Sequence, residues 1–368
     1  MKKNLAIILS VLMVMSCFTL YSCSKKNDNT ETDSKTNVND SVVDTDAETE
    51  NESAIESESK IEAEVKLPEE PIKVYTLKGP TGMGMAKLIS DTDSSNSETP
   101  KYDFTIASSP DEVTAEIIKG NYDIAALPTN LAAVLYTKTE GKIRIAAVNT
   151  LGVLYILENG DEIKSIEDIS GKDIYATGQG STPEYVLNYI LEANNIDCNV
   201  TYLADHSELA SLMMSGEVKL GLLPVPNATT VIASGAAHAA LNMTEEWEKA
   251  AEKNGDSSAL YMGCIIINPD FIENYPDAVE KFLTEYAESV EYVNKNIDEA
   301  ADMIEACGII PKAAVAKLAI PDANIVCITG EEMAEGLIGF YDVLFKFNPK
   351  SVGGSLPEND IFYINEQK

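Results

Sequence analysis

Apolar residues recur along this chain with two different periods, and the alternation of the two predicts an α/β fold. Short apolar runs of strand length, such as Ile72–Leu77 and Tyr102–Ala107, are followed by stretches with apolar residues at helical spacing. The longest helical pattern is Pro269–Asn296, with Val279, Phe282 and further apolar residues on one face. We expect strands and amphipathic helices to follow each other from about residue 71 onward.

The stretch Ile174–Leu191 predicts a buried strand, a glycine-rich turn and a helix. Gly178 and Gly180 allow the backbone to turn tightly, and Thr182 suits the N-cap position in front of Pro183. A helix that begins there has free N–H groups and the positive end of its dipole at the tip of a strand. Such a place can hold a small polar or anionic group.

The same design occurs a second time in the chain. Val74–Ile89 is also a strand, a turn with Gly and Pro, and a helix, which we expect over about Met83–Ile89. Each copy is followed by a helix end, a strand and a Leu-Pro pair, with the same spacing in Gly120–Pro128 and Gly216–Pro224. This repetition predicts two α/β lobes whose strand-end loops meet at a ligand cleft. The alternative is a set of ordinary turns without a binding role.

The order of elements predicts how the lobes divide the chain. We expect residues 71–155 and 263–368 in lobe 1 and residues 156–262 in lobe 2. The chain would cross between the lobes near Tyr155 and return through the apolar strand Tyr261–Ile267.

Residues 1–23 have the features of a secretion signal. Lys2 and Lys3 precede a short apolar run, which is below the ~20 residues that a spanning helix needs. Leu20–Cys23 resembles a lipoprotein signal, in which the cysteine becomes lipid-modified and N-terminal. Cys17 is a competing position, but it would leave an apolar segment at the mature end. We predict a lipid anchor, of the palmitate-bearing kind, on Cys23; a plain signal peptide is the alternative.

Ser24–Glu70 reads as a disordered tether. It contains 15 acidic and 5 basic residues and no aromatic residue. Such a segment cannot bury enough apolar surface to offset its ordering entropy, and its like charges extend it. Behind a lipidated cysteine it would hold the folded part away from the bilayer.

The folded part is strongly acidic. The whole chain has a formal net charge of −33, of which the tether contributes −10 and the signal lysines +2, so −25 remains for residues 71–368. This charge argues against nucleic acid and anionic membrane surfaces as partners.

Taken in order, these pieces resemble the substrate-binding lipoproteins of ABC importers. The nearest group is formed by the nitrate, sulfonate, taurine and thiamine-precursor binding proteins. The resemblance covers about Pro71–Asn348 and rests on Asp123–Pro128, Ile169–Ile174, the glycine-rich turn and Asn268–Asn296. It implies a periplasmic-binding-protein-like fold, with two α/β lobes joined by a two-strand hinge and closing over a ligand. It also implies an extracytoplasmic location, ABC permease subunits as partners, and a monomer.

By position, the binding loops of that family would fall on four segments and one hinge residue of this chain. The implied ligand-binding residues are Thr81, Gly82, Met83, Pro128, Thr129, Asn130, Tyr155, Gln179, Gly180, Ser181, Thr182, Pro224 and Asn227.

The chemistry of these loops constrains the ligand. Binding proteins for amino acids commonly hold the carboxylate with a bidentate arginine, but the sole arginine, Arg144, lies away from the four loops. The loops offer hydroxyl, amide and backbone N–H groups, with Lys78 as the only nearby cation. We therefore expect a neutral or weakly charged, partly apolar heterocycle such as a vitamin precursor. A small anion held by helix starts alone is the alternative.

An enzyme is not expected, nor a cofactor or a metal. The chain has only two histidines and none of the common hydrolase, metalloprotease or paired-cysteine motifs. His206 could line the cleft, although a surface loop is the expected place for it, and His238 is expected in an Ala-rich helix or loop. Some relatives of this fold are pyrimidine-forming enzymes, and a ligand sensor for signalling is a further alternative to import.

The remaining notable residues are expected to be structural. Cys198, Cys264, Cys307 and Cys327 lie in scattered, partly apolar contexts, which favours buried free thiols over disulfides. Trp247, the sole tryptophan, lies in a charged helical stretch and is expected to be half-buried, with a lid role as the alternative.

Overall fold

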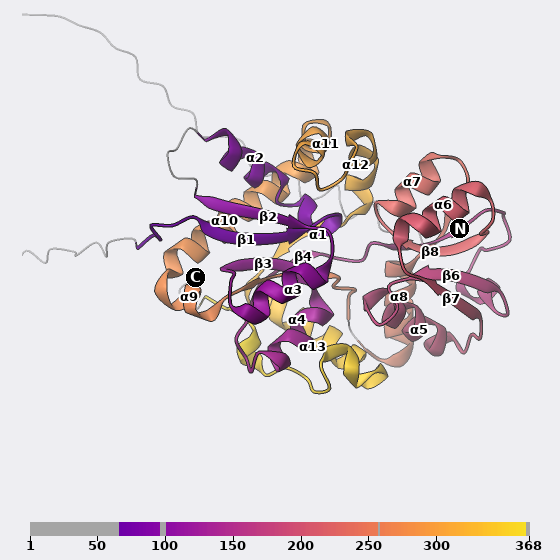
Figure 1. The fold of residues 1–368 in the computed structure, drawn as a ribbon. Helices are drawn as coiled ribbons and strands as arrows, with labels where there is room; N and C mark the ends of the chain where they lie inside the picture. Colours follow the sequence, from indigo (N-terminus) through magenta and orange to yellow (C-terminus); the bar gives the residue numbers. More distant parts are fainter. Residues whose placement is uncertain (1–65, 96–100, 257, 366–368) are drawn as a thin grey trace, which may run out of the picture. The chain divides into compact units, whose positions relative to one another are not determined.

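The computed structural model describes residues 66–95, 101–256 and 258–365. These residues form two β-sheets flanked by helices (Figure 1). The predicted α/β fold class is confirmed. The predicted signal peptide, Cys17, Cys23 and nearly all of the acidic tether lie outside the described residues.

The first sheet has six strands in the order β11–β4–β10–β3–β1–β2. These strands are β1 (Ile72–Leu77), β2 (Tyr102–Ala107), β3 (Ile124–Pro128), β4 (Arg144–Thr150), β10 (Gly263–Ile267) and β11 (Ile325–Ile328). β1 pairs in parallel with β2 and β3, while β10 runs antiparallel between β3 and β4. Every residue of β10 is buried, as expected for a short apolar strand in the middle of a covered sheet.

The second sheet has five strands in the order β7–β6–β8–β5–β9. These strands are β5 (Leu154–Glu158), β6 (Asp173–Thr177), β7 (Asn199–Leu203), β8 (Leu220–Pro224) and β9 (His238–Asn242). β6 is parallel to β7 and β8, and β5 pairs antiparallel with β8 and β9. The expectation that His238 lies in a helix or loop was wrong, since it begins the edge strand β9 and is exposed. Strand β9 has the sequence His-Ala-Ala-Leu-Asn, whose adjacent alanines give only a weak strand pattern.

Helices flank both sheets. The helices that follow strands of the first sheet along the chain are α1 (Pro80–Met83), α2 (Ala86–Ser94), α3 (Pro110–Lys119), α4 (Thr129–Lys138), α9 (Pro269–Asn274), α10 (Pro276–Lys295), α11 (Ile297–Ala306), α12 (Ala313–Ala319) and α13 (Gly330–Phe347). The helices that follow strands of the second sheet are α5 (Thr182–Asn194), α6 (His206–Ser215), α7 (Asn227–Ala233) and α8 (Met243–Asn254). Short 3₁₀ helices occur at Ile166–Ile169, Ile320–Asp322, Pro349–Val352 and Asn359–Ile361. No described helix is both long and apolar enough to span a bilayer.

Two expected helices are each divided in two. The helix predicted over Met83–Ile89 consists of α1 and α2, which are separated at Gly84; a Cβ on this glycine would lie 2.7 Å from the hydroxyl oxygen of Tyr286. The pattern Pro269–Asn296 breaks at Tyr275, whose φ of −139° and ψ of 55° are not helical. A residue in front of a proline disfavours helical angles, and Pro276 follows Tyr275 directly.

The chain passes between the two sheets twice. Leu151–Val153 connects β4 to β5, and the segment between α8 and β10 returns the chain to the first sheet. The backbone N–H of Met262 donates to the carbonyl of Thr150 at 2.9 Å, so the two passages run next to each other. Strand β10 begins at Gly263, two residues later than expected.

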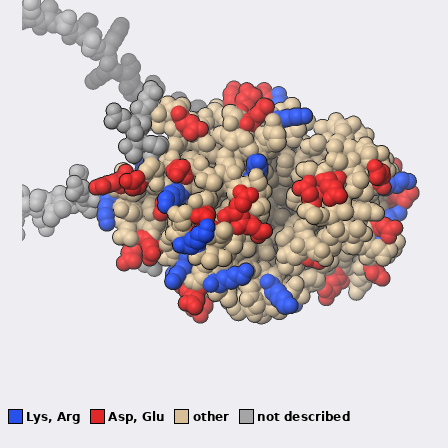
Figure 2. All heavy atoms as spheres, viewed as in Figure 1, with Lys and Arg blue, Asp and Glu red and all other residues tan. Residues whose placement is uncertain are grey.

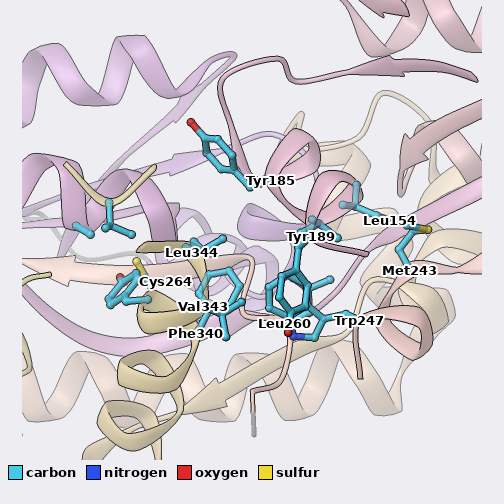
Figure 3. Packing of buried hydrophobic residues seen from close by; sticks show 14 of the residues in the cluster. Leu154, Tyr185, Tyr189, Met243, Trp247, Leu260, Cys264, Phe340, Val343 and Leu344 are labelled. Carbon is cyan, nitrogen blue, oxygen red and sulfur yellow. The ribbon is translucent and has the colours of Figure 1, made fainter. Parts of the chain in front are cut away.

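Trp247 lies in the main apolar core. Its ring is fully buried between Tyr189 of α5 and Phe340 of α13, with ring centroids 4.5 and 5.6 Å away (Figure 3). Its indole N–H donates to the carbonyl of Ser258 at 2.9 Å. The expectation of a half-buried residue was therefore wrong. Glu245, Glu248 and Lys249 are exposed, whereas Trp247 lies on the buried side of α8 together with Glu246. A fully buried ring also rules out a lid role in this conformation.

Candidate functional site

A cleft of about 670 Å³ lies where loops of both sheets meet. Its wall includes the segments after β1, β2 and β6, the end of β3, the turn after β8 and the loop between α11 and α12. A larger hollow of about 900 Å³ lies elsewhere, over α10, β11 and the start of α13. We regard the first cleft as the candidate site, because the strand-end loops of both sheets converge only there among the described hollows.

The wall of the cleft combines apolar side chains with uncharged polar groups. Prolines and aliphatic residues such as Val153 and Ile310 lie beside hydroxyl groups of Thr81 and Ser211. Figure 2 shows acidic and basic side chains spread over the visible face and a hollow with acidic groups on both sides of it. A wall of this kind suits a small, partly apolar molecule that also makes hydrogen bonds.

Several helices begin at this wall. The first residues of α3, α5 and α6, which are Pro110, Thr182 and His206, all line the cleft. The N–H groups of a first helical turn have no acceptor within the helix, and the helix dipole places partial positive charge there. The cleft therefore favours acceptor atoms on a bound molecule.

Six of the predicted binding residues line the cleft. They are Thr81, Pro128, Ser181, Thr182, Pro224 and Asn227. The other seven do not. Met83 is fully buried in the apolar core, and Gly82 is buried where a Cβ would lie 2.1 Å from the carbonyl oxygen of Leu77. Gln179 and Gly180 are exposed beyond the wall, and Tyr155 is half-buried on β5.

Thr129 and Asn130 are buried behind the wall. The hydroxyl of Thr129 donates to the carbonyl of Tyr261 at 2.5 Å. The side-chain oxygen of Asn130 accepts a hydrogen bond from the hydroxyl of Thr182 at 2.8 Å. This bond joins the first turn of α4, beside the first sheet, to the first turn of α5, beside the second.

The glycine-rich turn after β6 has the predicted tight geometry. Gly178 has φ of 78°, and a Cβ there would lie 2.9 Å from both Pro183 and the hydroxyl of Ser181, so a larger residue would be strained. The N-cap of α5 is Ser181 rather than the expected Thr182. The helix therefore starts at Thr182, one residue earlier than the pattern suggested. The Thr182 hydroxyl is not used as a cap and instead donates to Asn130.

His206 lies at the cleft rather than in a surface loop, which corrects the expected place. It is the first residue of α6 and half-buried, and its Nδ1 is hydrogen-bonded to the hydroxyl of Thr177. Burial lowers the pKa of His206, and the charge of Asp205 opposes this shift. The sequence signal for its position is its place between the end of a strand and the start of a helix.

The pKa of His206 predicts a pH dependence of stability. Its folded-state pKa lies below the unfolded value near 6.5, so the unfolded chain binds more protons as pH falls below about 6.5. The stabilisation is therefore present above that pH and is lost as pH falls toward the folded pKa. We expect the melting temperature of wild type to fall more between pH 7 and 5 than that of His206→Asn. An equal fall in melting temperature for the two proteins over this pH range would contradict a lowered pKa of His206.

Charged groups at the wall are few. Lys78, Lys312 and Asp205 line the cleft besides His206. Lys312 comes from the loop before α12 and was not among the expected site residues, because its sequence neighbourhood carries no binding motif. Arg144 does not line the cleft, and its guanidinium pairs with Asp360 at 3.1 Å.

The described residues contain no group of three or more His, Cys, Asp and Glu side chains that could hold a metal ion. The cysteines in this part of the chain are free thiols, as expected, although only Cys264 is fully buried. Burial raises the pKa of the Cys327 thiol to about 11 and that of Cys307 to about 11, so neither is a reactive thiolate at neutral pH.

Comparison with known proteins bears on this geometry. The model of the NMT1/THI5 like family matches residues 103–300. No curated protein sequence matches significantly. Among solved structures, an ABC transporter protein from Parabacteroides distasonis is 24% identical, with a TM-score of 0.68, over 81% of this chain and 99% of that one.

Two sulfonate-binding proteins share the fold at lower identity. The aliphatic sulphonate binding protein from Escherichia coli is 13% identical, with a TM-score of 0.64, over 82% of this chain and 95% of that one. The alkanesulfonate-binding protein from Xanthomonas axonopodis pv. citri, bound to MOPS, is 13% identical, with a TM-score of 0.61, over 82% and 100%. These neighbours are named as transport and binding proteins.

The family model covers more than half of the chain, and the solved structures share its two-sheet fold. The resemblance to binding proteins of ABC importers expected from the sequence is thus confirmed, and the chain belongs to the NMT1/THI5-like family.

Proposed function

We propose that this protein is the extracytoplasmic solute-binding component of an ABC importer. It captures a small molecule by closure of two lobes, acts as a monomer and delivers the molecule to permease subunits. The observation that carries the proposal is the cleft of about 670 Å³, whose wall is built by strand-end loops and helix starts of both sheets. The names of the similar structures, an ABC transporter protein and two sulfonate-binding proteins, support the same class.

The proposed ligand is a partly apolar, neutral or weakly charged heterocycle, such as a vitamin precursor. Apolar groups of the wall suit a ring, and its hydroxyl, amide and N–H groups suit ring nitrogens and carbonyls. The cleft is also larger than an inorganic anion requires.

Small-angle scattering tests the closure. Ligand binding shifts such a protein between two states only if it binds one state better, and closure makes the particle more compact. We compare protein as purified with protein unfolded, stripped of small molecules and refolded. The stripped protein is expected to have the larger radius of gyration, and returning the stripped fraction should restore the compact form. Identical profiles throughout, with a released molecule identified, would contradict closure.

We further propose that Cys23 carries a lipid that anchors the protein to the outer face of the cell membrane. The motive is the short apolar run before Leu20–Cys23. Cys23→Ala is expected to release the protein into the medium or leave it unprocessed, whereas Cys17→Ala should change neither. Membrane fractionation and the mass of the mature N-terminus give the answer. A processed, membrane-bound Cys23→Ala protein would rule the anchor out.

A further inference from the structure

Two lysines from distant parts of the chain line the same cleft. Lys78 follows strand β1, and Lys312 precedes α12. The backbone N–H of Gly79 donates to the carbonyl of Ile309 at 3.3 Å, which holds the two loops together on the side of the first sheet. Both lysine side chains are exposed, so their ammonium groups remain hydrated until a bound molecule covers them.

No described carboxylate forms an ion pair with these two lysines, and Glu305, near Lys312, accepts the backbone N–H of Ala313 at 2.9 Å. Neither ammonium group is in an ion pair with a described residue, while Lys101 and Lys317 elsewhere pair with Glu285 and Asp298. Two lysines without an ion-pair partner are unexpected on so acidic a protein, because carboxylates outnumber lysines and arginines by 60 to 27 over the chain.

Asp205 is the only carboxylate among the described residues that line the cleft. Its side chain caps α6, accepting the backbone N–H groups of Ser207 at 2.8 Å and Glu208 at 3.0 Å. This carboxylate is in no ion pair with either lysine, but its charge counts toward that of the wall. With His206 neutral, the formal charge of the wall is +1, the charge that one anionic group balances.

The size and lining of the cleft determine what carries that group. Pockets of about 300–1,000 Å³ hold drug-sized organic molecules, and this cleft of about 670 Å³ lies within that range. Ile309, Ile310 and Val315 line it next to Lys312, and Pro226 lines it as well. An inorganic anion would leave these apolar groups against water.

We propose that the cleft binds an organic monoanion, with its anionic group between Lys78 and Lys312 and its apolar body against the aliphatic residues beside Lys312. The proposal rests on the proposed binding function and narrows its ligand from neutral or weakly charged to singly negative. Lys78 and Lys312 are then the residues that determine specificity for charge.

Matched ligand pairs test this assignment. A thermal-shift and calorimetric panel contains heterocyclic and aromatic carboxylates, sulfonates and phosphate monoesters, each with its neutral amide or alcohol analogue. We compare stripped wild type, Lys78→Gln, Lys312→Gln and the control Lys219→Gln, an exposed lysine outside the cleft. The best wild-type hit is expected to be an anion. Each cleft variant should weaken it about fivefold, as for a partly exposed charge pair, and Lys219→Gln should leave it unchanged.

The salt dependence gives a second readout. Affinity of the anion for wild type should fall from 20 to 300 mM NaCl, and less so for the double variant Lys78→Gln/Lys312→Gln. A neutral best hit, or an anionic hit equally strong in the double variant, overturns the monoanion proposal and leaves the binding function intact. If no compound of either set binds, the result counts against the binding function as well.

Discussion

Replacing Trp247 by alanine is expected to lower the free energy of unfolding by about 3–5 kcal/mol, the range for deleting a large buried aromatic side chain. The ring lies fully buried between Tyr189 and Phe340, so its removal leaves a cavity where α5, α8 and α13 meet. It also leaves the carbonyl of Ser258 without the donor that the indole N–H supplies. Urea unfolding followed by far-UV circular dichroism measures the change.

Two controls separate packing from the hydrogen bond. Trp247→Phe retains a ring but loses the donor, and should cost less than the alanine variant. Ile118→Ala removes a side chain that is 58% exposed, and should change stability by less than about 0.5 kcal/mol. A Trp247→Ala protein as stable as the Ile118→Ala protein would show that the tryptophan is not packed as described.

Removing the hydroxyl of Thr182 is expected to destabilise the described conformation by about 1–3 kcal/mol. The buried side-chain oxygen of Asn130 would lose the hydrogen bond it accepts at 2.8 Å, and a buried polar group left unpaired incurs its full desolvation cost. The bond joins α4, beside the first sheet, to α5, beside the second. If it forms only when the proposed lobes are closed, its removal should weaken ligand affinity. Unfolding and binding are therefore measured on Thr182→Val and Asn130→Ala.

A double-mutant cycle identifies the contact. If Thr182 and Asn130 act through each other, the double variant should be little worse than either single one. Thr92→Val is the matched control, because its hydroxyl bonds to the carbonyl of Leu88 within its own helix. Fully additive losses in the cycle would show that the two side chains act separately.

Much of the architecture could be predicted from local pattern. The repeated order of apolar run, glycine turn and helix located β1, β3, β6 and β8, because strand ends and helix starts depend on nearby residues, whereas the edge strand β9 was missed. The break at Gly84 shows the limit of local pattern, whereas the break at Tyr275 follows from the adjacent Pro276. The break at Gly84 coincides with the close approach of Tyr286, which lies far away in the sequence.

The site was harder to predict than the fold. The loops after β6 and β8 and the end of β3 were located by their Gly and Leu-Pro signals, but only six of the thirteen predicted side chains line the cleft. Thr129 and Asn130 lie behind the wall because they bond to Tyr261 and Thr182, which no spacing rule anticipates. Lys312 reaches the cleft through the hydrogen bond between the loops of Gly79 and Ile309. Lys312, the second lysine of the wall, could therefore be identified only from the tertiary structure.

Trp247 shows that local composition and helical periodicity can predict different degrees of burial. Its neighbours in sequence are mostly charged, which suggested partial exposure. Met243, Trp247, Ala250 and Ala251 nevertheless recur at helical spacing and form the buried face of α8. Periodicity predicted this burial better than local composition did.

Native mass spectrometry of the protein as purified tests most directly the central claim that the cleft holds one small molecule. Ser211→Trp places a bulky side chain in the cleft, whereas Ser215→Trp places it one turn further along α6, outside the wall. The account predicts one bound small molecule on wild type and on Ser215→Trp, and its loss from Ser211→Trp. Bare polypeptide mass in all three proteins, or a bound molecule retained equally by Ser211→Trp, would contradict it.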